Sequence, residues 1–117
     1  MSTNDWGKFI GATDERMMAL RAAMPDVAKA FGRLAGAATA EGVLDTKTKE
    51  LIVLAIGIAA RCDGCVAYHA RAAARHGAQR SEILETIGMA VYMGGGPSMI
   101  YGAEALSAFD ALSVVPG

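Results

Sequence analysis

The 117-residue sequence lacks the features that define several large classes of protein. Two cysteines are too few for a disulfide-stapled secreted scaffold. Eleven Lys and Arg residues against twelve Asp and Glu residues give a net charge of −1, so there is no basic excess for phosphate contacts with a nucleic acid. Only 20% of the residues are charged, which excludes a disordered acidic or basic tail, because so apolar a chain collapses in water.

Long apolar segments are also missing. The wholly apolar run over residues 51–60 is far shorter than the ~20 residues that a membrane-spanning helix needs. No charge occurs over residues 86–103, but glycines and a proline at positions 94–97 interrupt that stretch. The first eleven residues lack the basic and apolar regions of a signal peptide. We therefore expect a soluble, cytoplasmic protein that binds neither membranes nor nucleic acids.

Alanine is abundant, with 24 residues, whereas aromatic residues make up only 6% of the chain. Because alanine is the best helix former, this composition predicts an all-α fold. Hydrophobic residues reach 53%, and a monomer of this size buries only roughly 65% of the surface of its unfolded chain. One small bundle cannot bury all of this apolar surface, so we expect a homo-oligomer.

Prolines, glycines and capping residues divide the chain into a bundle of five or six helices in a single domain. Asp45 can cap the third helix, and Gln79 and Glu82 have the spacing of a capping box for the fifth. We place residues 1–19 in an N-terminal arm that includes the start of the first helix, and residues 20–117 in the helical domain. The first helix is expected at about residues 14–23, after a poorly defined segment. The third is apolar throughout residues 51–60, which predicts a central helix buried on all sides.

Two cysteines three residues apart precede a histidine in the pattern Cys62-x-x-Cys65-x-x-x-His69. The pair falls at a predicted helix start, where the partial positive charge of the helix lowers a thiol pKa. His69 lies one helical turn after Cys65 and can exchange protons with a thiol. The helix charge acts most on Cys62, whereas the imidazole lies nearest Cys65, so the spacing leaves open which thiol attacks.

Glu50 is a further candidate, because a carboxylate against an apolar helix can act as a proton relay. Its alternative interpretation is a solvated first-turn charge beside two lysines, Lys47 and Lys49. The cysteines could instead be buried hydrophobic residues, or they could bind a zinc ion together with His69 and with Glu50 as the fourth ligand. His76 is interpreted as a helix C-terminal residue without a catalytic role.

Taken together, Glu50, the cysteine pair and His69 resemble the AhpD-like alkylhydroperoxidase branch of the carboxymuconolactone decarboxylase superfamily. The segments LDTKTKEL at residues 44–51 and MGGGP at residues 93–97 are similar to those of its small single-domain members. The similarity covers residues 20–112. Better-known peroxidase members carry a second histidine where this chain has Gly64, and two related helical halves where it has one.

The resemblance implies an AhpD-like all-α bundle that forms trimers or hexamers, and an antioxidant oxidoreductase that reduces hydroperoxides. It implies that Cys65 is the peroxidatic thiol and Cys62 the resolving thiol, with His69 and Glu50 as the proton relay. A lipoyl or thioredoxin-like dithiol protein would reduce the disulfide. No cofactor and no metal ion are expected. Decarboxylase members lack the cysteine pair, so lactone decarboxylation is not implied.

Two alternative functions are kept. The first is a thiol–disulfide reductase or redox sensor without significant peroxidase turnover. The second is a non-enzymatic oligomer that binds a small ligand or a metal.

Overall fold

The computed structural model describes residues 5–113, which form six α-helices and contain no strand. This confirms the predicted all-α, single-domain fold. The helices are α1 (Trp6–Ala23), α2 (Pro25–Thr39), α3 (Thr46–Ala59), α4 (Asp63–Arg75), α5 (Arg80–Gly94) and α6 (Gly96–Leu112). Among the described residues, no helix is both long and apolar enough to cross a membrane.

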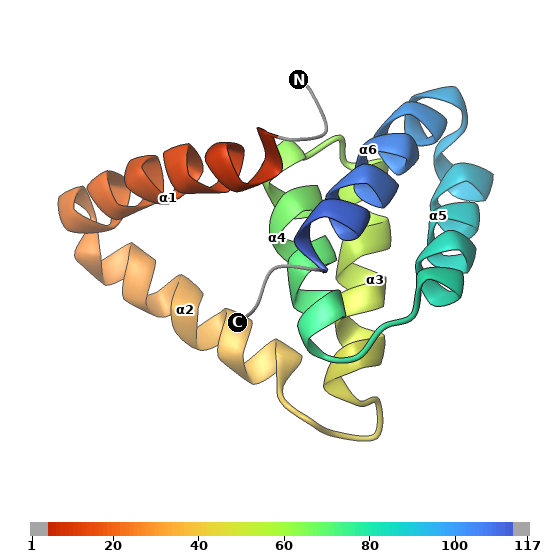
Figure 1. The fold of residues 1–117 in the computed structure, drawn as a ribbon. Helices are drawn as coiled ribbons and strands as arrows, with labels where there is room; N and C mark the ends of the chain where they lie inside the picture. The colour runs from red at the N-terminus through yellow and green to blue at the C-terminus, as the bar shows by residue number, and fades with distance from the viewer. Residues whose placement is uncertain (1–4, 114–117) are drawn as a thin grey trace.

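Helices α3 to α6 pack together as a bundle that contains most of the buried side chains (Figure 1). Leu54 and Ile58 of α3, Val66 of α4 and Ile83 of α5 are fully buried at its centre. Much of the remaining core is alanine, whose small side chain lets helix axes approach closely. The bundle therefore gains its packing from close helix contacts rather than from large aromatic residues.

The prediction that the third helix is buried on all sides is wrong. Ile52 and Ile56 of α3 are 44% and 62% exposed, although Leu54 and Ile58 of the same helix are fully buried. The reason is geometric, because α4, α5 and α6 pack on one side of α3 and leave the opposite side open. An apolar strip of α3 thus remains at the surface of the single chain.

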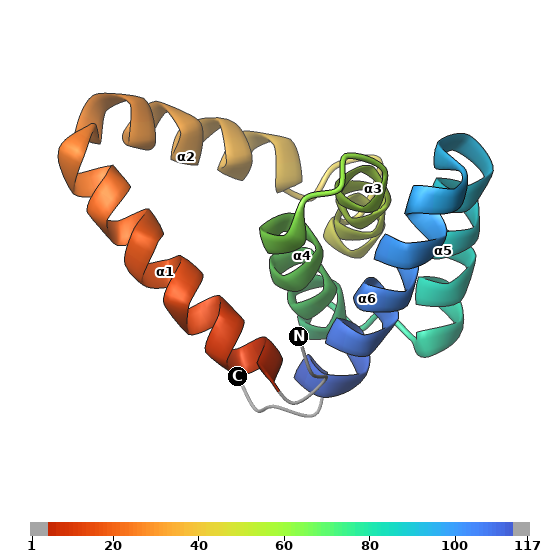
Figure 2. The same ribbon diagram turned by 90° about the horizontal axis from the view of Figure 1, so that it is seen from above.

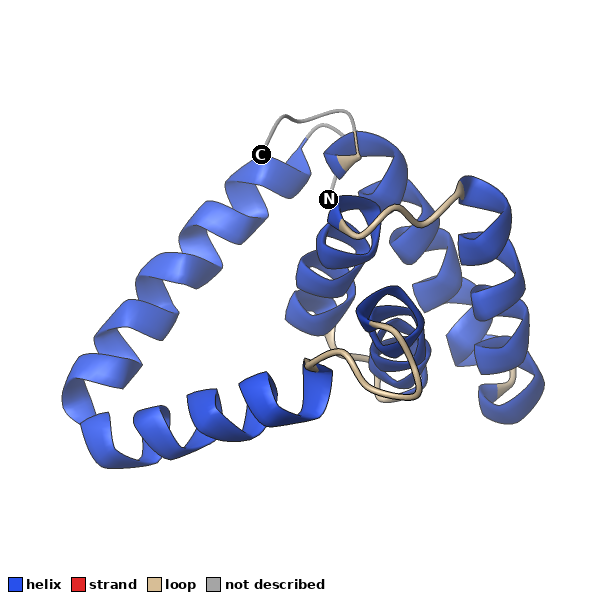
Figure 3. Cartoon of the chain, turned by 90° about the horizontal axis from the view of Figure 1, so that it is seen from below, coloured by secondary structure: helices blue, strands red, loops and turns tan. Residues whose placement is uncertain are grey.

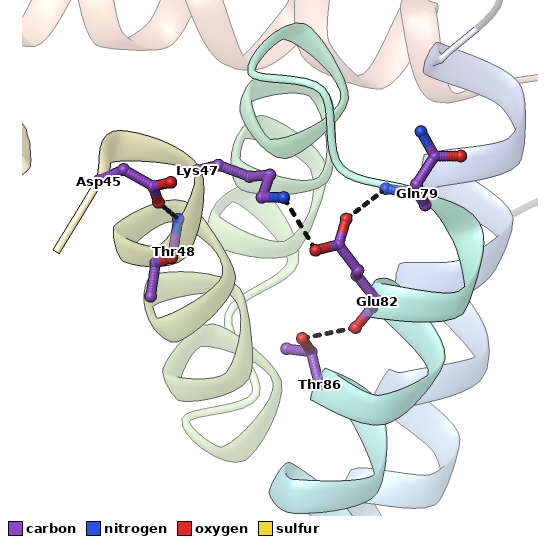
Figure 4. Close-up of polar contacts among 6 residues, drawn as sticks. All are labelled: Asp45, Lys47, Thr48, Gln79, Glu82 and Thr86. Carbon is purple, nitrogen blue, oxygen red and sulfur yellow. Dashed lines mark hydrogen bonds and ion pairs between the residues drawn. The ribbon is translucent and has the colours of Figure 1, made fainter.

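Side-chain caps fix the starts of α3 and α5, as the sequence predicts (Figure 4). Asp45 accepts a hydrogen bond from the backbone N–H of Thr48 at 2.8 Å, and the Glu82 carboxylate accepts one from the backbone N–H of Gln79 at 2.8 Å. Glu82 also pairs with Lys47 at 2.9 Å, which ties α5 to α3. The backbone N–H of Gln79, and then the Lys47 ammonium, lower the pKa of Glu82.

The first helix begins earlier than predicted, at Trp6 instead of residue 14. Trp6 and Ile10 are each 4% exposed, and Trp6 Nε1 donates a hydrogen bond to Ser107 Oγ of α6 at 3.0 Å. The sequence pattern missed the helix over residues 6–13 because this part is stabilised by packing against α6, a partner about a hundred residues away in the chain. Tertiary contact thus turns the expected poorly defined segment into helix.

Helices α1 and α2 form a V that stands away from the bundle (Figures 2 and 3). From here on we call these two helices the arm, a longer segment than the N-terminal arm of residues 1–19 that the sequence predicts. No residue of α2 is buried. Its C-terminal end is tied to the start of α3, where Thr46 Oγ1 donates to the Thr39 carbonyl at 3.0 Å and Lys49 Nζ donates to the Ala40 carbonyl at 2.7 Å. The arm therefore contacts the bundle through the first half of α1 and the end of α2.

Candidate functional site

The chain turns sharply between α3 and the cysteine pair. The N–H of Cys62 donates to the Gly57 carbonyl at 3.0 Å, and the N–H of Arg61 donates to the Ile58 carbonyl at 3.1 Å. These two bonds are those of a Schellman helix end, in which the intervening residue takes a left-handed conformation. Arg61 occupies that position with a φ of 58°, where glycine is the usual residue. This turn places Cys62 directly at the start of α4.

Cys62 and Cys65 form a disulfide in the first turn of α4, with their Cα atoms 5.2 Å apart. Cys62 is the N-cap residue, and its Sγ accepts the backbone N–H of Cys65 at 3.1 Å. Both cysteines are partly exposed, so they are not simply buried hydrophobic residues. The free N–H groups of a helix start favour negative charge, so a thiolate formed here on reduction is stabilised.

Glu50 and His69 form a second pair beside the cysteines. Glu50 Oε1 lies 2.7 Å from His69 Nδ1, joining α3 to α4. Glu50 is only 7% exposed, and the two neighbouring lysines point to other partners, Lys47 to Glu82 and Lys49 to the Ala40 carbonyl. The interpretation of Glu50 as a solvated first-turn charge is therefore wrong.

The contact with Glu50 orients the imidazole ring of His69. A Glu50 carboxylate can only accept a hydrogen bond, so Nδ1 of His69 carries the hydrogen in this contact. In the neutral imidazole, this tautomer leaves Nε2 free to accept a proton. The His69 side chain is 31% exposed, so the ring is reachable from solvent. Cys65 lies one turn before His69 on α4. The structure thus brings Glu50, Cys65 and His69 to the α3–α4 contact, and Cys62, the fourth predicted residue, is bonded to Cys65.

Gly57 belongs to the site, and the sequence analysis missed it. A Cβ atom added there would lie 3.0 Å from Cys65 Cβ, so the absence of a side chain lets α3 approach the cysteine. The signal that could have revealed it is spacing, because Gly57 follows Glu50 by seven residues, which is two helical turns on one face. A glycine inside an otherwise bulky apolar run marks such a close approach.

Helix α1 contacts α4, the helix that begins at the cysteine pair, on the side that carries Tyr68. Tyr68 of α4 donates a hydrogen bond to the Asp14 carboxylate of α1, and the Arg71 guanidinium lies 5.4 Å from the centre of the Tyr68 ring. Burial, and then the contact with Asp14, raise the pKa of Tyr68. Near this contact, Thr13 lies beside Gly64, the residue that precedes Cys65. The contact between Tyr68 and Asp14 therefore fixes the arm to α4.

A second tyrosine contacts the segment between the two cysteines. Tyr101 of α6 interacts with Asp63, and this interaction is the main reason why the pKa of Tyr101 is raised. The nearby Arg61 acts in the opposite direction. The Cys62–Cys65 turn is thus held from the α6 side as well as from the α3 side.

His76 is the C-cap residue of α4, the position predicted for it. Within residues 5–113, no three His, Cys, Asp or Glu side chains are grouped closely enough to hold a metal ion. The two sulfurs are bonded to each other, and Glu50 is engaged with His69. The donor set of the zinc alternative is therefore not assembled in this structure.

Comparison with known proteins adds a family match. The model of the carboxymuconolactone decarboxylase family matches residues 25–108. An uncharacterized protein of Cupriavidus necator is 41% identical over 95% of this chain and 98% of its own length.

Two solved structures are also similar. A carboxymuconolactone decarboxylase family protein from Legionella pneumophila has a TM-score of 0.91 and 44% identity, over 94% of this chain and 98% of that one. A family protein from Thermotoga maritima, described with a possible involvement in the antioxidative response, has a TM-score of 0.78 and 31% identity, over 90% and 89% of the two chains.

Proposed function

Because this chain belongs to the carboxymuconolactone decarboxylase family, we propose that it works as an AhpD-like, thiol-dependent oxidoreductase that reduces hydroperoxides. The observation that carries the proposal is the Cys62–Cys65 disulfide at a helix start beside the Glu50–His69 pair. The antioxidative description of the Thermotoga maritima relative agrees with it. No cofactor enters the proposed cycle.

The first step oxidises one thiol. The thiolate of Cys65 attacks the outer peroxide oxygen, the O–O bond breaks, and the products are a sulfenic acid on Cys65 and an alkoxide. Nε2 of His69 takes the thiol proton beforehand and returns it to the alkoxide, which leaves as an alcohol. Glu50 stabilises the imidazolium that forms between these transfers. The position of Cys65 one turn from His69 supports its assignment as the attacking thiol.

The second step forms the observed disulfide. The Cys62 thiolate attacks the sulfenic sulfur of Cys65, and the displaced oxygen leaves as water after taking up a proton. An external dithiol then reduces the disulfide and is itself oxidised to a disulfide, which returns both cysteines to thiols. A lipoyl or thioredoxin-like protein has the chemistry required of this reductant. In this proposal the working form is a cytoplasmic homo-oligomer.

Intact-mass measurement on the reduced protein tests the proposal. One equivalent of peroxide should remove two hydrogens from the wild type. Cys62→Ser should instead gain one oxygen, trapped on Cys65, while Cys65→Ser should stay unmodified under the same conditions. Trapping on Cys62 in Cys65→Ser would reverse the assigned roles.

A turnover assay separates peroxide reduction from the alternative of thiol–disulfide exchange. The proposed enzyme should consume alkyl hydroperoxide catalytically when a dithiol such as dihydrolipoamide is supplied. A protein that exchanges disulfides with this dithiol but leaves peroxide intact would instead be a thiol–disulfide reductase or a redox sensor.

A further inference from the structure

Two spacings that suit a metal ion share Cys65. Cys62 and Cys65 are three residues apart at the start of α4, which is the spacing of cysteine pairs that bind zinc. Cys65 and His69 are four residues apart on the same helix, and ligands at this spacing lie on one face and can hold one ion. The described residues present no complete metal site in this oxidised form, in which the two sulfurs are bonded to each other. Reduction of the disulfide frees both sulfurs.

Contacts with α3 show that Cys65 and His69 lie on one face of α4. Cys65 packs at Gly57 of α3, and His69 meets Glu50 of the same helix. Helical side chains also lean toward the N-terminus of their helix, so the imidazole lies over the turn that begins at Cys65. The His69 side chain is 31% exposed and both cysteines are partly exposed, so an ion can reach these groups from solvent.

The contact between Glu50 and His69 is the arrangement that supports a histidine ligand. Nδ1 of His69 lies 2.7 Å from Glu50 Oε1, so the ring is held through one nitrogen while the other is free. Histidine ligands of zinc usually donate their second ring N–H to a carboxylate or a carbonyl in this way, which fixes the tautomer and the ring orientation. Glu50 is therefore engaged as the partner of a ligand and is not a ligand itself.

We propose that the reduced protein binds one zinc ion through Cys62, Cys65 and Nε2 of His69, with water as the fourth ligand. Zinc favours four ligands in a tetrahedron, and with Zn–S bonds of about 2.3 Å the two sulfurs lie about 3.8 Å apart. The Cα atoms of the two cysteines are 5.2 Å apart, and rotation of either side chain separates the freed sulfurs without moving the backbone. Both thiols lose their protons to solvent when the ion binds.

The ion regulates the redox site, and this consequence rests on the proposed function. In the proposed cycle the Cys65 thiolate attacks the peroxide and Nε2 of His69 carries the proton, and zinc occupies both groups. Bound zinc therefore inhibits the reduced enzyme and takes no part in the cycle. When a peroxide molecule takes two electrons from the two thiolates and two protons from solvent, it becomes an alcohol and water, the disulfide forms, and the ion is released. The metal site thus exists only in the reduced state.

Titration with Co²⁺, which absorbs light where zinc does not, tests the ligand set without using peroxide. The reduced wild type should bind one equivalent and show the absorption of tetrahedral cobalt with thiolate-to-metal charge-transfer bands. Zinc should then displace the cobalt and remove both signals. The oxidised wild type should show neither signal, because its sulfurs are bonded to each other.

Variants separate the ligand from its partner. Glu50→Gln should weaken zinc binding by about 10–100-fold, as expected for loss of the group that orients a histidine ligand, and His69→Ala should weaken it further. The matched control is His76→Ala, which changes the exposed histidine at the end of α4 and should bind zinc like the wild type. Competition of the reduced proteins with a chelator of known affinity measures the binding, and circular dichroism checks that each variant keeps its helices.

Equal zinc affinity of the wild type and His69→Ala would overturn the proposal, because the cysteine pair would then bind the ion alone. Identical cobalt spectra of the reduced and oxidised proteins, or no binding by either, would overturn it as well.

The regulation is measured separately from the binding. Zinc should slow peroxide oxidation of the reduced wild type in proportion to the fraction of protein that holds the ion, and EDTA should restore the rate. A protein that binds zinc but does not react with peroxide would keep the metal site and lose the proposed function. A protein that is oxidised equally fast with and without bound zinc would keep the function and overturn the regulation.

Discussion

The surroundings of Glu50 determine what its carboxylate can do. A buried carboxylate is unfavourable unless a partner compensates for its lost hydration, and here the partner is His69 Nδ1 at 2.7 Å. The same contact selects the tautomer with a free Nε2 acceptor. In the proposed cycle Glu50 is thus a positioning residue, because it acts through His69 and does not contact the peroxide itself.

Glu50→Gln tests that role, because the amide keeps the size of the side chain and removes its charge. Peroxide oxidation of Cys65 should slow by roughly 10–100-fold, as expected for loss of a group that orients a histidine. Stopped-flow kinetics provide the measurement, with Glu85→Gln, which changes an exposed carboxylate of α5, as the control. An unchanged rate would contradict the role of Glu50.

At the scale of elements, the site depends on how closely α3 and α4 pack. Gly57 and Glu50 lie on one face of α3 and meet Cys65 and His69 of α4. The Schellman turn through Arg61 sets the reversal between these helices and holds Cys62 at the start of α4. The geometry of the redox pair is therefore a property of the helix pair and its connecting turn.

Substitutions of two glycines test this close approach. Gly57→Ala should lower the free energy of unfolding by about 1–3 kcal/mol, because its methyl group would crowd Cys65 Cβ at 3.0 Å and neither backbone can yield easily. Gly88→Ala should raise it by about 0.5–1 kcal/mol, because no atom lies within 4 Å and alanine favours helix. Urea denaturation of the oxidised proteins measures both values. Equal stabilisation by the two changes would mean that α3 and α4 do not meet at Gly57.

The described residues form a packed bundle and an arm that is fixed to it through the first half of α1 and the end of α2. Trp6 anchors the start of α1 on α6, and Tyr68 anchors its middle on α4 through Asp14. The apex between α1 and α2 has no comparable anchor on the bundle (Figure 1). Stability should therefore be unequal, highest in the bundle and lowest in α2.

Hydrogen exchange with Trp6→Ala tests this division. Loss of the buried indole should cost about 3–5 kcal/mol and should accelerate amide exchange mainly in α1, while α3 and α5 stay protected. Trp6→Phe is the matched control, since it retains most of the apolar contact and removes the Ser107 hydrogen bond, at a cost of about 1 kcal/mol. Uniform acceleration across all six helices would contradict an arm that loosens independently of the bundle.

The sequence by itself determined the local features of this protein. Alanine content predicts helix, Asp45 and Glu82 predict the helix starts that form, and the cysteine spacing places two sulfurs at one helix end. Each of these features depends on residues within about one helical turn, so short-range physical rules are sufficient. The spacing also identified His69 and Glu50 as candidates, but not their contact.

Only the tertiary structure decided which groups meet across helices. The Glu50–His69 pair, the fit of Gly57 against Cys65 and the early start of α1 at Trp6 all join residues far apart in the chain. The helical period gives the face on which a side chain lies, but it does not identify the partner helix that covers that face. The same limit explains the exposed strip of α3, because an apolar run shows that burial is favourable and only packing determines which side is buried.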